Sequence, residues 1–178
     1  MIKSFDFYFD FISPYSFLAH KEIRKIEKKN SIHIRYKPIL LGGLHNLHGI
    51  KAPAFIPAKA KHMIRDCKLI SEKNKIKFKF NSYFPIRSLN LMRGVLVAEE
   101  DNIKNYYIDN IFNTVWQDGL NMNDENIIKK ILKNLNINPN TFFLRSASSL
   151  IKDSLRKKTT EAYEKGIFGA PTFVSNNK

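Results

Sequence analysis

The chain has 178 residues, a formal net charge of +14 at pH 7 and a single cysteine, Cys67. This length is near that of one domain and is sufficient for a hydrophobic core, while one cysteine excludes an internal disulfide. No apolar run approaches the about 20 residues of a membrane-spanning helix, and the N-terminus leads into a predicted strand without an apolar signal segment, so we expect a cytoplasmic protein with no membrane partner.

The positive charge raises nucleic acid as a partner. The basic residues are spread over several predicted helices, in a sequence that is also rich in asparagine and isoleucine. No basic stretch is interleaved with aromatic residues, as it is in proteins that bind single strands. We therefore predict no nucleic-acid partner and only a general field that attracts small anions.

Near the N-terminus, a predicted strand runs directly into a predicted helix. Residues 5–10 alternate phenylalanine with aspartate or tyrosine, which predicts a strand with two unlike faces. Apolar residues from 15 to 26 recur at spacings of three and four, which predicts an amphipathic helix. Ser13 is then the N-cap and Pro14 the first helical residue. Capping alone is the ordinary role of a serine at this position.

The middle of the chain is predicted to be mostly helical. Residues 32–37 alternate again up to Pro38, which predicts a second strand, parallel to the first and reached by a right-handed crossover. Residues 44–55 contain glycine, asparagine and proline and are predicted to form a loop. Helical spacing and cap signals then predict helices from residue 57, at 88–100, 103–117 and 124–134, after 138–139, and at 148–165, the last ending at Gly166.

A proline precedes the last predicted strand. Ala170 and Pro171 stand directly before the short apolar segment 172–174. A proline at this place indicates an edge strand or a cis peptide bond.

Together, the segment 10–16 and the Ala170-Pro171 step resemble the DsbA-like branch of the thioredoxin superfamily, in which a cis-proline loop faces an active-site turn. The resemblance extends to the 2-hydroxychromene-2-carboxylate isomerases and the kappa-class glutathione transferases. It rests on segments whose order and spacing are similar to those of that family, namely 41–43, 53–59, 84–89 and 115–119. It implies an α/β fold in which a thioredoxin-like sheet carries a large all-helical insertion.

This resemblance predicts three parts of the chain. Residues 1–56 would form the N-terminal part of the thioredoxin-like domain, 57–165 the helical insertion, and 166–178 the C-terminal part with the cis-proline loop and strand. In the family, a hairpin strand and a final helix follow, with an acidic turn that holds the γ-glutamyl end of glutathione. The sequence ends at Lys178, so we expect these elements to be missing.

Redox chemistry is not expected at the active-site turn. Residues 13–16 read Ser-Pro-Tyr-Ser, whereas disulfide exchange needs two cysteines there. Cys67 has apolar spacing with Met63 and Ile70 and is predicted to be a core residue. A serine hydrolase is not favoured, because no nucleophile elbow accompanies Ser13. The Ser13 hydroxyl at a helix N-terminus can instead donate to a ligand sulfur, where the helix dipole favours a thiolate.

The resemblance implies glutathione as the cofactor and Ser13 as the residue that stabilises its thiolate. Lys59 would meet a glutathione carboxylate, and the backbone of Ala170, next to Pro171, would pair with the cysteinyl unit. Lys59 fits an ordinary exposed lysine at a helix start equally well. Ile50 stands where the family usually has an asparagine, so a hydrogen bond worth about 1 kcal/mol is lost.

Substrate contacts are predicted at Arg87 and Trp116. Arg87 could pair with a carboxylate, and Trp116 could form an aromatic wall over the thiol. The alternatives are a solvent-facing Arg87 and a Trp116 that packs in the core. His45 and His48 have no cysteine or carboxylate partner at metal spacing, so no metal is predicted.

The leading prediction of function is therefore a glutathione-dependent isomerase of the 2-hydroxychromene-2-carboxylate type, acting on a small aromatic or conjugated carboxylate. One alternative is a kappa-like transferase that conjugates glutathione to small electrophiles. Another is a catalytically silent thioredoxin-fold binding protein, which Ile50 and the short C-terminus favour. The resemblance also implies a homodimer.

Overall fold

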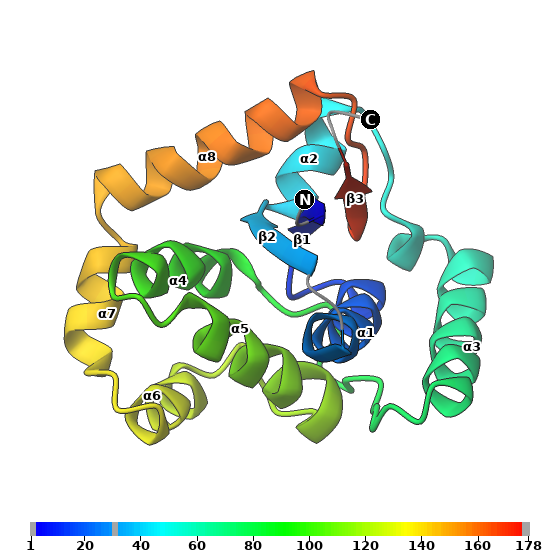
Figure 1. Cartoon of the computed structure of the whole chain (residues 1–178), viewed down its shortest axis with the longest axis horizontal. Helices are drawn as coiled ribbons and strands as arrows, with labels where there is room; N and C mark the ends of the chain where they lie inside the picture. Colours follow the sequence, from blue (N-terminus) through cyan, green and yellow to red (C-terminus); the bar gives the residue numbers. More distant parts are fainter. Residues whose placement is uncertain (1–2, 30–31, 176–178) are drawn as a thin grey trace.

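The computed structural model describes residues 3–29 and 32–175, and a three-stranded sheet stands at its centre (Figure 1). The strand order is β2-β1-β3. β1 (Lys3–Phe9) pairs in parallel with β2 (Ile32–Pro38) and antiparallel with β3 (Thr172–Val174). The mixed sheet with its helices confirms the thioredoxin-like fold, and β3 is the edge strand that was predicted.

Helices make up most of the remaining described chain. α1 connects β1 to β2 as a parallel pair requires. The peptide bond between Ala170 and Pro171, just before β3, is cis. The helical elements are α1 (Pro14–Lys29), α2 (Leu41–Leu47), the 3₁₀ turn η1 (Pro53–Phe55), α3 (Pro57–Lys73), α4 (Leu89–Glu100), α5 (Lys104–Asn113), the π-helical turn η2 (Thr114–Asp118), α6 (Glu125–Asn134), α7 (Pro139–Ser146) and α8 (Ser149–Glu164).

The caps expected from the sequence are present. Ser13 Oγ accepts the backbone N–H of Ser16 at 3.1 Å, and Asp124 caps α6. Asn138 caps α7, and Gly166 follows α8 with φ +73°, a conformation that glycine adopts without strain.

The loop predicted at residues 44–55 is wrong in part, because α2 and η1 lie there. The glycine, asparagine and proline of this segment favoured a loop in the sequence. Tertiary contacts stabilise α2: Leu44 is fully buried, and the N–H of Leu40 donates to Thr159 Oγ1 on α8 at 3.0 Å. Such contacts override a weak local propensity.

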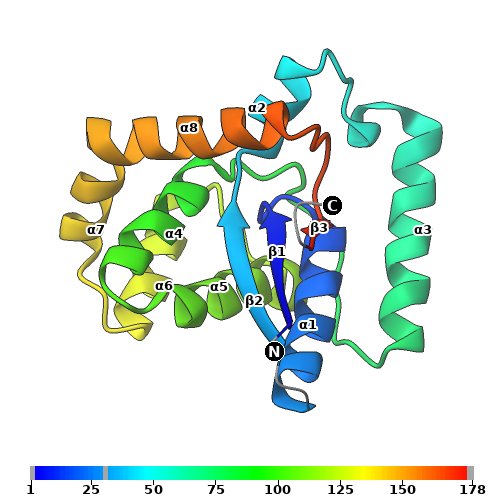
Figure 2. The same cartoon turned by 45° about the horizontal axis from the view of Figure 1, so that its top comes forward.

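Aromatic side chains form the centre of the core. Phe7 and Phe9 of β1 pack edge-on against Tyr36 of β2, with ring centroids 5.3 and 5.6 Å apart. Figure 2 shows β1 and β2 with α4 and α5 on one side, while α3 stands on the side of the molecule opposite α7. The sheet thus fixes the turn after β1, and α3 faces that turn from outside.

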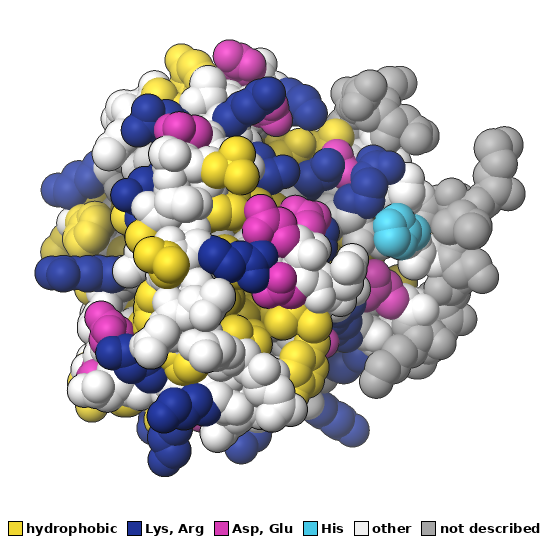
Figure 3. All heavy atoms as spheres, turned by 90° about the vertical axis from the view of Figure 1, so that its left-hand side faces the viewer, with side chains coloured by type: hydrophobic (Ala, Val, Ile, Leu, Met, Phe, Trp, Pro, Cys, Tyr) yellow, Lys and Arg dark blue, Asp and Glu magenta, His cyan; other side chains and the backbone are white. Residues whose placement is uncertain are grey.

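The positive charge is not gathered into a uniform patch on the face that Figure 3 shows, where α7 lies. Basic side chains there stand among acidic and hydrophobic ones. Arg145 of α7, for example, pairs with Glu100 at 2.7 Å and Asp101 at 2.8 Å. None of the helices in residues 3–29 and 32–175 is long and apolar enough to cross a membrane.

A buried histidine makes stability depend on pH. His20 of α1 is 1% exposed, and its ring nitrogens lie 2.8 Å from Tyr36 Oη and 2.9 Å from Asp109 Oδ1. Burial lowers the pKa of His20 below 6.5, and this effect outweighs the attraction of Asp109. The unfolded chain therefore binds more protons than the folded one as the pH falls through about 6.5.

We expect the free energy of unfolding to decrease between about pH 7 and pH 5, with a weaker pH dependence in His20→Gln. Denaturant unfolding at a series of pH values measures both slopes. His33→Gln, which changes an exposed histidine of β2, is the matched control. Equal slopes in wild type and His20→Gln would show that other groups cause the loss.

Candidate functional site

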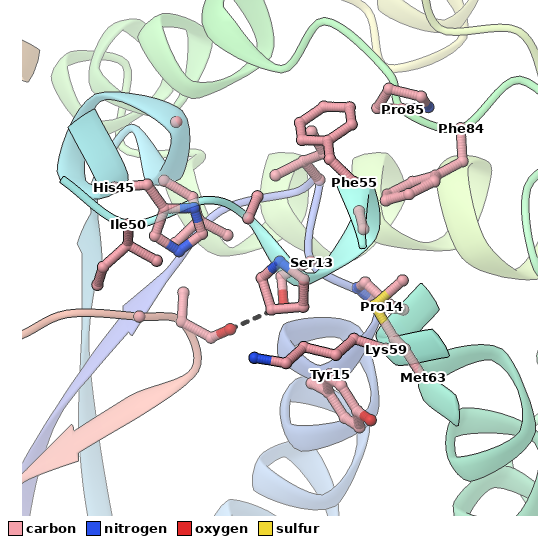
Figure 4. A pocket seen from close by; sticks show the side chains of 18 of the residues that line it. Ser13, Pro14, Tyr15, His45, Ile50, Phe55, Lys59, Met63, Phe84 and Pro85 are labelled. Carbon is pink, nitrogen blue, oxygen red and sulfur yellow. Dashed lines mark hydrogen bonds between the residues drawn. The ribbon is translucent and has the colours of Figure 1, made fainter. Parts of the chain in front are cut away.

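A pocket of about 820 Å³ opens beside the N-terminus of α1 (Figure 4). It lies between the Ser13 turn, α2, the segment around η1, the first turns of α3 and the loop before β3. Most of the lining side chains are apolar, and the titratable ones are Tyr15, His45, Lys59 and His62. Elements far apart in the sequence thus enclose one cavity.

Ser13 stands at the edge of this pocket with its hydroxyl held by two hydrogen bonds. Its Oγ–H donates to the backbone carbonyl of Ala170 at 2.9 Å, the contact drawn in Figure 4. Its Oγ also accepts from the N–H of Ser16, within the first turn of α1. That turn contains no acidic residue, so no carboxylate there competes with a bound anion.

Asp10 holds the Ser13 turn in place through hydrogen bonds to the backbone. Its side chain is fully buried. Its oxygens accept the backbone N–H of Ile12 at 3.0 Å and of Leu41, the first residue of α2, at 2.8 Å. The Asp10 carbonyl accepts the N–H of Ser13 at 3.1 Å. Burial raises the pKa of Asp10, against the two backbone N–H groups that lower it. One carboxyl group therefore joins two walls of the pocket.

Trp116 does not line the pocket; it lies behind the turn. It is fully buried, and its Nε1–H donates to the backbone carbonyl of Phe11 at 2.8 Å. The N–H of the same Phe11 donates to Met92 Sδ at 3.4 Å. Phe84, which does line the pocket, packs against Trp116 with ring centroids 5.9 Å apart. Trp116 thus fixes the backbone that leads to Ser13.

The structure brings together Ser13, Lys59 and Ala170 around one pocket. Pro171 follows Ala170 but is not among the lining residues. Arg87 is exposed outside the pocket, where its backbone N–H donates to Asn123. Arg87 and Trp116 are therefore not brought to the pocket as substrate contacts.

Tyr15 connects α1 to the outer wall of the pocket. Its hydroxyl donates to Asp66 Oδ2 of α3 at 2.8 Å. The neighbouring Cys67 is fully buried, which confirms its prediction as a core residue, and burial raises the pKa of its thiol to about 12. In the described part of the chain, no three His, Cys, Asp or Glu side chains form a metal-binding group.

Comparison with known proteins gives the family. The model of the DSBA-like thioredoxin domain matches residues 4–178. The chain belongs to the DSBA-like thioredoxin family.

Several relatives of this DsbA-like protein are enzymes. It is 27% identical to a 2-hydroxychromene-2-carboxylate isomerase of Sphingobium xenophagum, over 96% of this chain and 88% of that protein. It is 26% identical to a kappa 2 glutathione S-transferase of Caenorhabditis elegans, over 95% of this chain and 79% of that protein. A solved 2-hydroxychromene-2-carboxylate isomerase superposes with a TM-score of 0.89 at 23% identity, covering 98% of this chain and 86% of that one. The resemblance inferred from the motifs is confirmed.

Some residues of the DsbA-like site carried no clear signal in the sequence. Asp10 read as a polar residue of an alternating strand, although an aspartate just before a turn commonly accepts nearby backbone N–H groups. His45 fell in a predicted loop, and only the helix α2 places it in the pocket. The roles of Asp10 and His45 follow only from the contact between the Ser13 turn and α2, which joins residues far apart in the sequence.

Proposed function

We propose that this DsbA-like protein is a glutathione-dependent isomerase of the 2-hydroxychromene-2-carboxylate type. The observation that carries the proposal is the Ser13 hydroxyl at the N-terminus of α1, beside a large apolar pocket. Relatives at 26–27% identity bear the names of this isomerase and of kappa glutathione transferases. A cytoplasmic location, where glutathione is reduced, is part of the proposal.

The residues around the pocket fit glutathione. Lys59 is an exposed cation in the first turn of α3 and can meet a carboxylate. The Ala170 backbone, at the pocket and next to the edge strand β3, can pair with an extended peptide. Apolar walls leave room for an aromatic or conjugated substrate.

Bound glutathione would supply a thiolate that adds reversibly to a conjugated carbon of the substrate and so permits rotation about the former double bond. Ser13 stabilises that negative charge when its O–H turns from the Ala170 carbonyl toward the sulfur. The free N–H groups of the first turn of α1 act in the same direction, because the helix N-terminus carries partial positive charge. Asp10 and Trp116 keep the turn in place through Ile12, Leu41 and Phe11.

The test is a calorimetric titration with glutathione, with the ultraviolet absorbance of the thiolate followed across about pH 5 to 8, and then turnover of 2-hydroxychromene-2-carboxylate. Catalytic turnover with glutathione retained supports the isomerase. Loss of glutathione in proportion to product supports a kappa-like transferase, the alternative suggested by the similarity to kappa glutathione transferases. If no glutathione binds at about 1 mM, both enzyme activities are rejected and a catalytically silent binding protein is the remaining alternative.

Lys59→Gln should raise the Kd for glutathione about two- to fivefold at low salt, because an exposed ion pair contributes about 0.5–1 kcal/mol. Calorimetry at two salt concentrations measures the effect, which screening should diminish. Lys61→Gln, at an exposed lysine that does not line the pocket, is the control. An equal loss in both variants would contradict a direct contact of Lys59.

A further inference from the structure

We propose that His45 is the proton acceptor of the pocket and takes the thiol proton of glutathione as the thiolate forms. The proposal rests on the proposed function and deepens it. The S–H bond breaks with its electron pair left on sulfur, and the proton bonds to an imidazole nitrogen of His45. The reverse transfer restores thiol and neutral imidazole, so the step needs no further reactant.

Geometry places His45 and Ser13 on the same cavity. Leu41, the first residue of α2, donates its N–H to Asp10, whose carbonyl accepts the N–H of Ser13. His45 lies four residues after Leu41 and hence on the same face of α2. Leu41, His45 and Ser13 all line the pocket. Figure 4 shows the His45 side chain extending from α2 into it.

Two of the other titratable groups of the pocket are poor acceptors. Tyr15 already donates its hydroxyl to Asp66, and burial together with this hydrogen bond raises its pKa. Lys59 is an ammonium, which donates but does not accept. His62 lines the pocket from an exposed position on α3, so it serves as the comparison in the test.

His45 itself is available to accept a proton. It is half-buried, and among residues 3–29 and 32–175 its ring nitrogens have no hydrogen-bond partner. Burial and the neighbouring His48 lower the pKa of His45 below 6.5, so the imidazole is neutral at pH 7. Once a thiolate lies nearby, its negative charge favours the imidazolium, as in cysteine–histidine pairs.

Among the described residues that line the pocket, no side chain is acidic, and the buried carboxyl of Asp10 accepts the N–H of Leu41, one turn before His45 on α2. The pocket faces it with Tyr15 of α1 and with Lys59 and His62 of α3. On α8, which packs against α2, Tyr163 contacts His48, with ring centroids 4.5 Å apart. The Nε2 of His48 lies 2.8 Å from the Ile167 carbonyl. His48 is thus engaged in structure, while His45 is free to react.

A proton inventory tests the proposal. Glutathione is titrated into the protein at pH 7 in buffers of different ionisation enthalpy, and thiolate absorbance is recorded in parallel. Wild type should release far less than one proton to the buffer for each thiolate formed, whereas His45→Gln should release about one. His62→Gln should keep the wild-type ratio of protons released to thiolate formed, whatever its affinity for glutathione. A structural role of His45 would alter affinity without altering this ratio.

Equal proton release by wild type and His45→Gln would overturn the role of His45 while leaving the proposed function intact. A wild type that binds no glutathione would overturn both. If His45→Gln binds too weakly for calorimetry, NMR titration of the His45 ring in wild type decides: its pKa should rise on glutathione binding, and an unchanged pKa rejects the proposal.

Discussion

Ser13→Ala should lose most of the thiolate that glutathione forms at neutral pH, and its turnover should fall about 10²-fold. Removal of one positioned donor to a developing anion typically has an effect of this size. The substitution also removes the cap of α1, because Ser13 Oγ accepts the N–H of Ser16. Loss of this cap should lower the folding stability by about 1 kcal/mol. Ultraviolet thiolate absorbance against pH, with and without the substitution, measures the chemical effect.

Ser16→Ala provides the matched control. Ser16 lies in the same turn, and its Oγ is buried without a hydrogen-bond partner among the described residues. Its removal should leave stability unchanged or raise it, since no bond is lost. Full thiolate formation in Ser13→Ala would show that the helix N-terminus alone provides the stabilisation, and that Ser13 only caps α1.

Asp10→Ala should lower the free energy of unfolding by about 2–4 kcal/mol, because two partly buried backbone N–H groups lose their fully buried acceptor at once. Those groups belong to Ile12 and Leu41, which lie on different walls of the pocket. We therefore expect glutathione affinity to fall together with stability. Asp10→Asn should lose less stability than Asp10→Ala, since one side-chain oxygen remains to accept a hydrogen bond and the cost of a buried charge disappears.

Denaturant unfolding and calorimetry measure these effects. Asp6→Ala is the control on the same strand, because Asp6 makes an ion pair with Arg35 at the surface, and such pairs contribute about 1 kcal/mol or less. A loss in Asp10→Ala no larger than in Asp6→Ala would contradict the role of Asp10 as the link between the turn and α2.

The local structure around Ser13 was predictable because short-range rules determine it. Alternation gave β1, and the Ser13-Pro14 pair gave the start of α1, which a hydrogen bond of 3.1 Å to Ser16 confirms. The edge position of β3 followed from Pro171. Each of these depends on a few consecutive residues.

The pocket itself depends on contacts between distant residues, which the sequence does not display. α2 begins where the N–H of Leu41 meets the side chain of Asp10, 31 residues earlier in the chain, and this contact leaves no signal in residues 44–55, which were predicted to form a loop. From the sequence, Trp116 could form a pocket wall, although a core position is the more usual one for a tryptophan. Only its hydrogen bond to Phe11, 105 residues away, places it behind the turn.

The burial of Cys67 has a consequence for counting thiols during turnover. The side chain is fully buried against the core and its pKa is about 12, whereas disulfide reagents react with accessible thiolates. In a mixture of the folded protein and glutathione, such a reagent therefore counts the thiol of glutathione alone. A constant count as product accumulates marks a cofactor that is regenerated, and a falling count marks a co-substrate, without any separation of protein from solution.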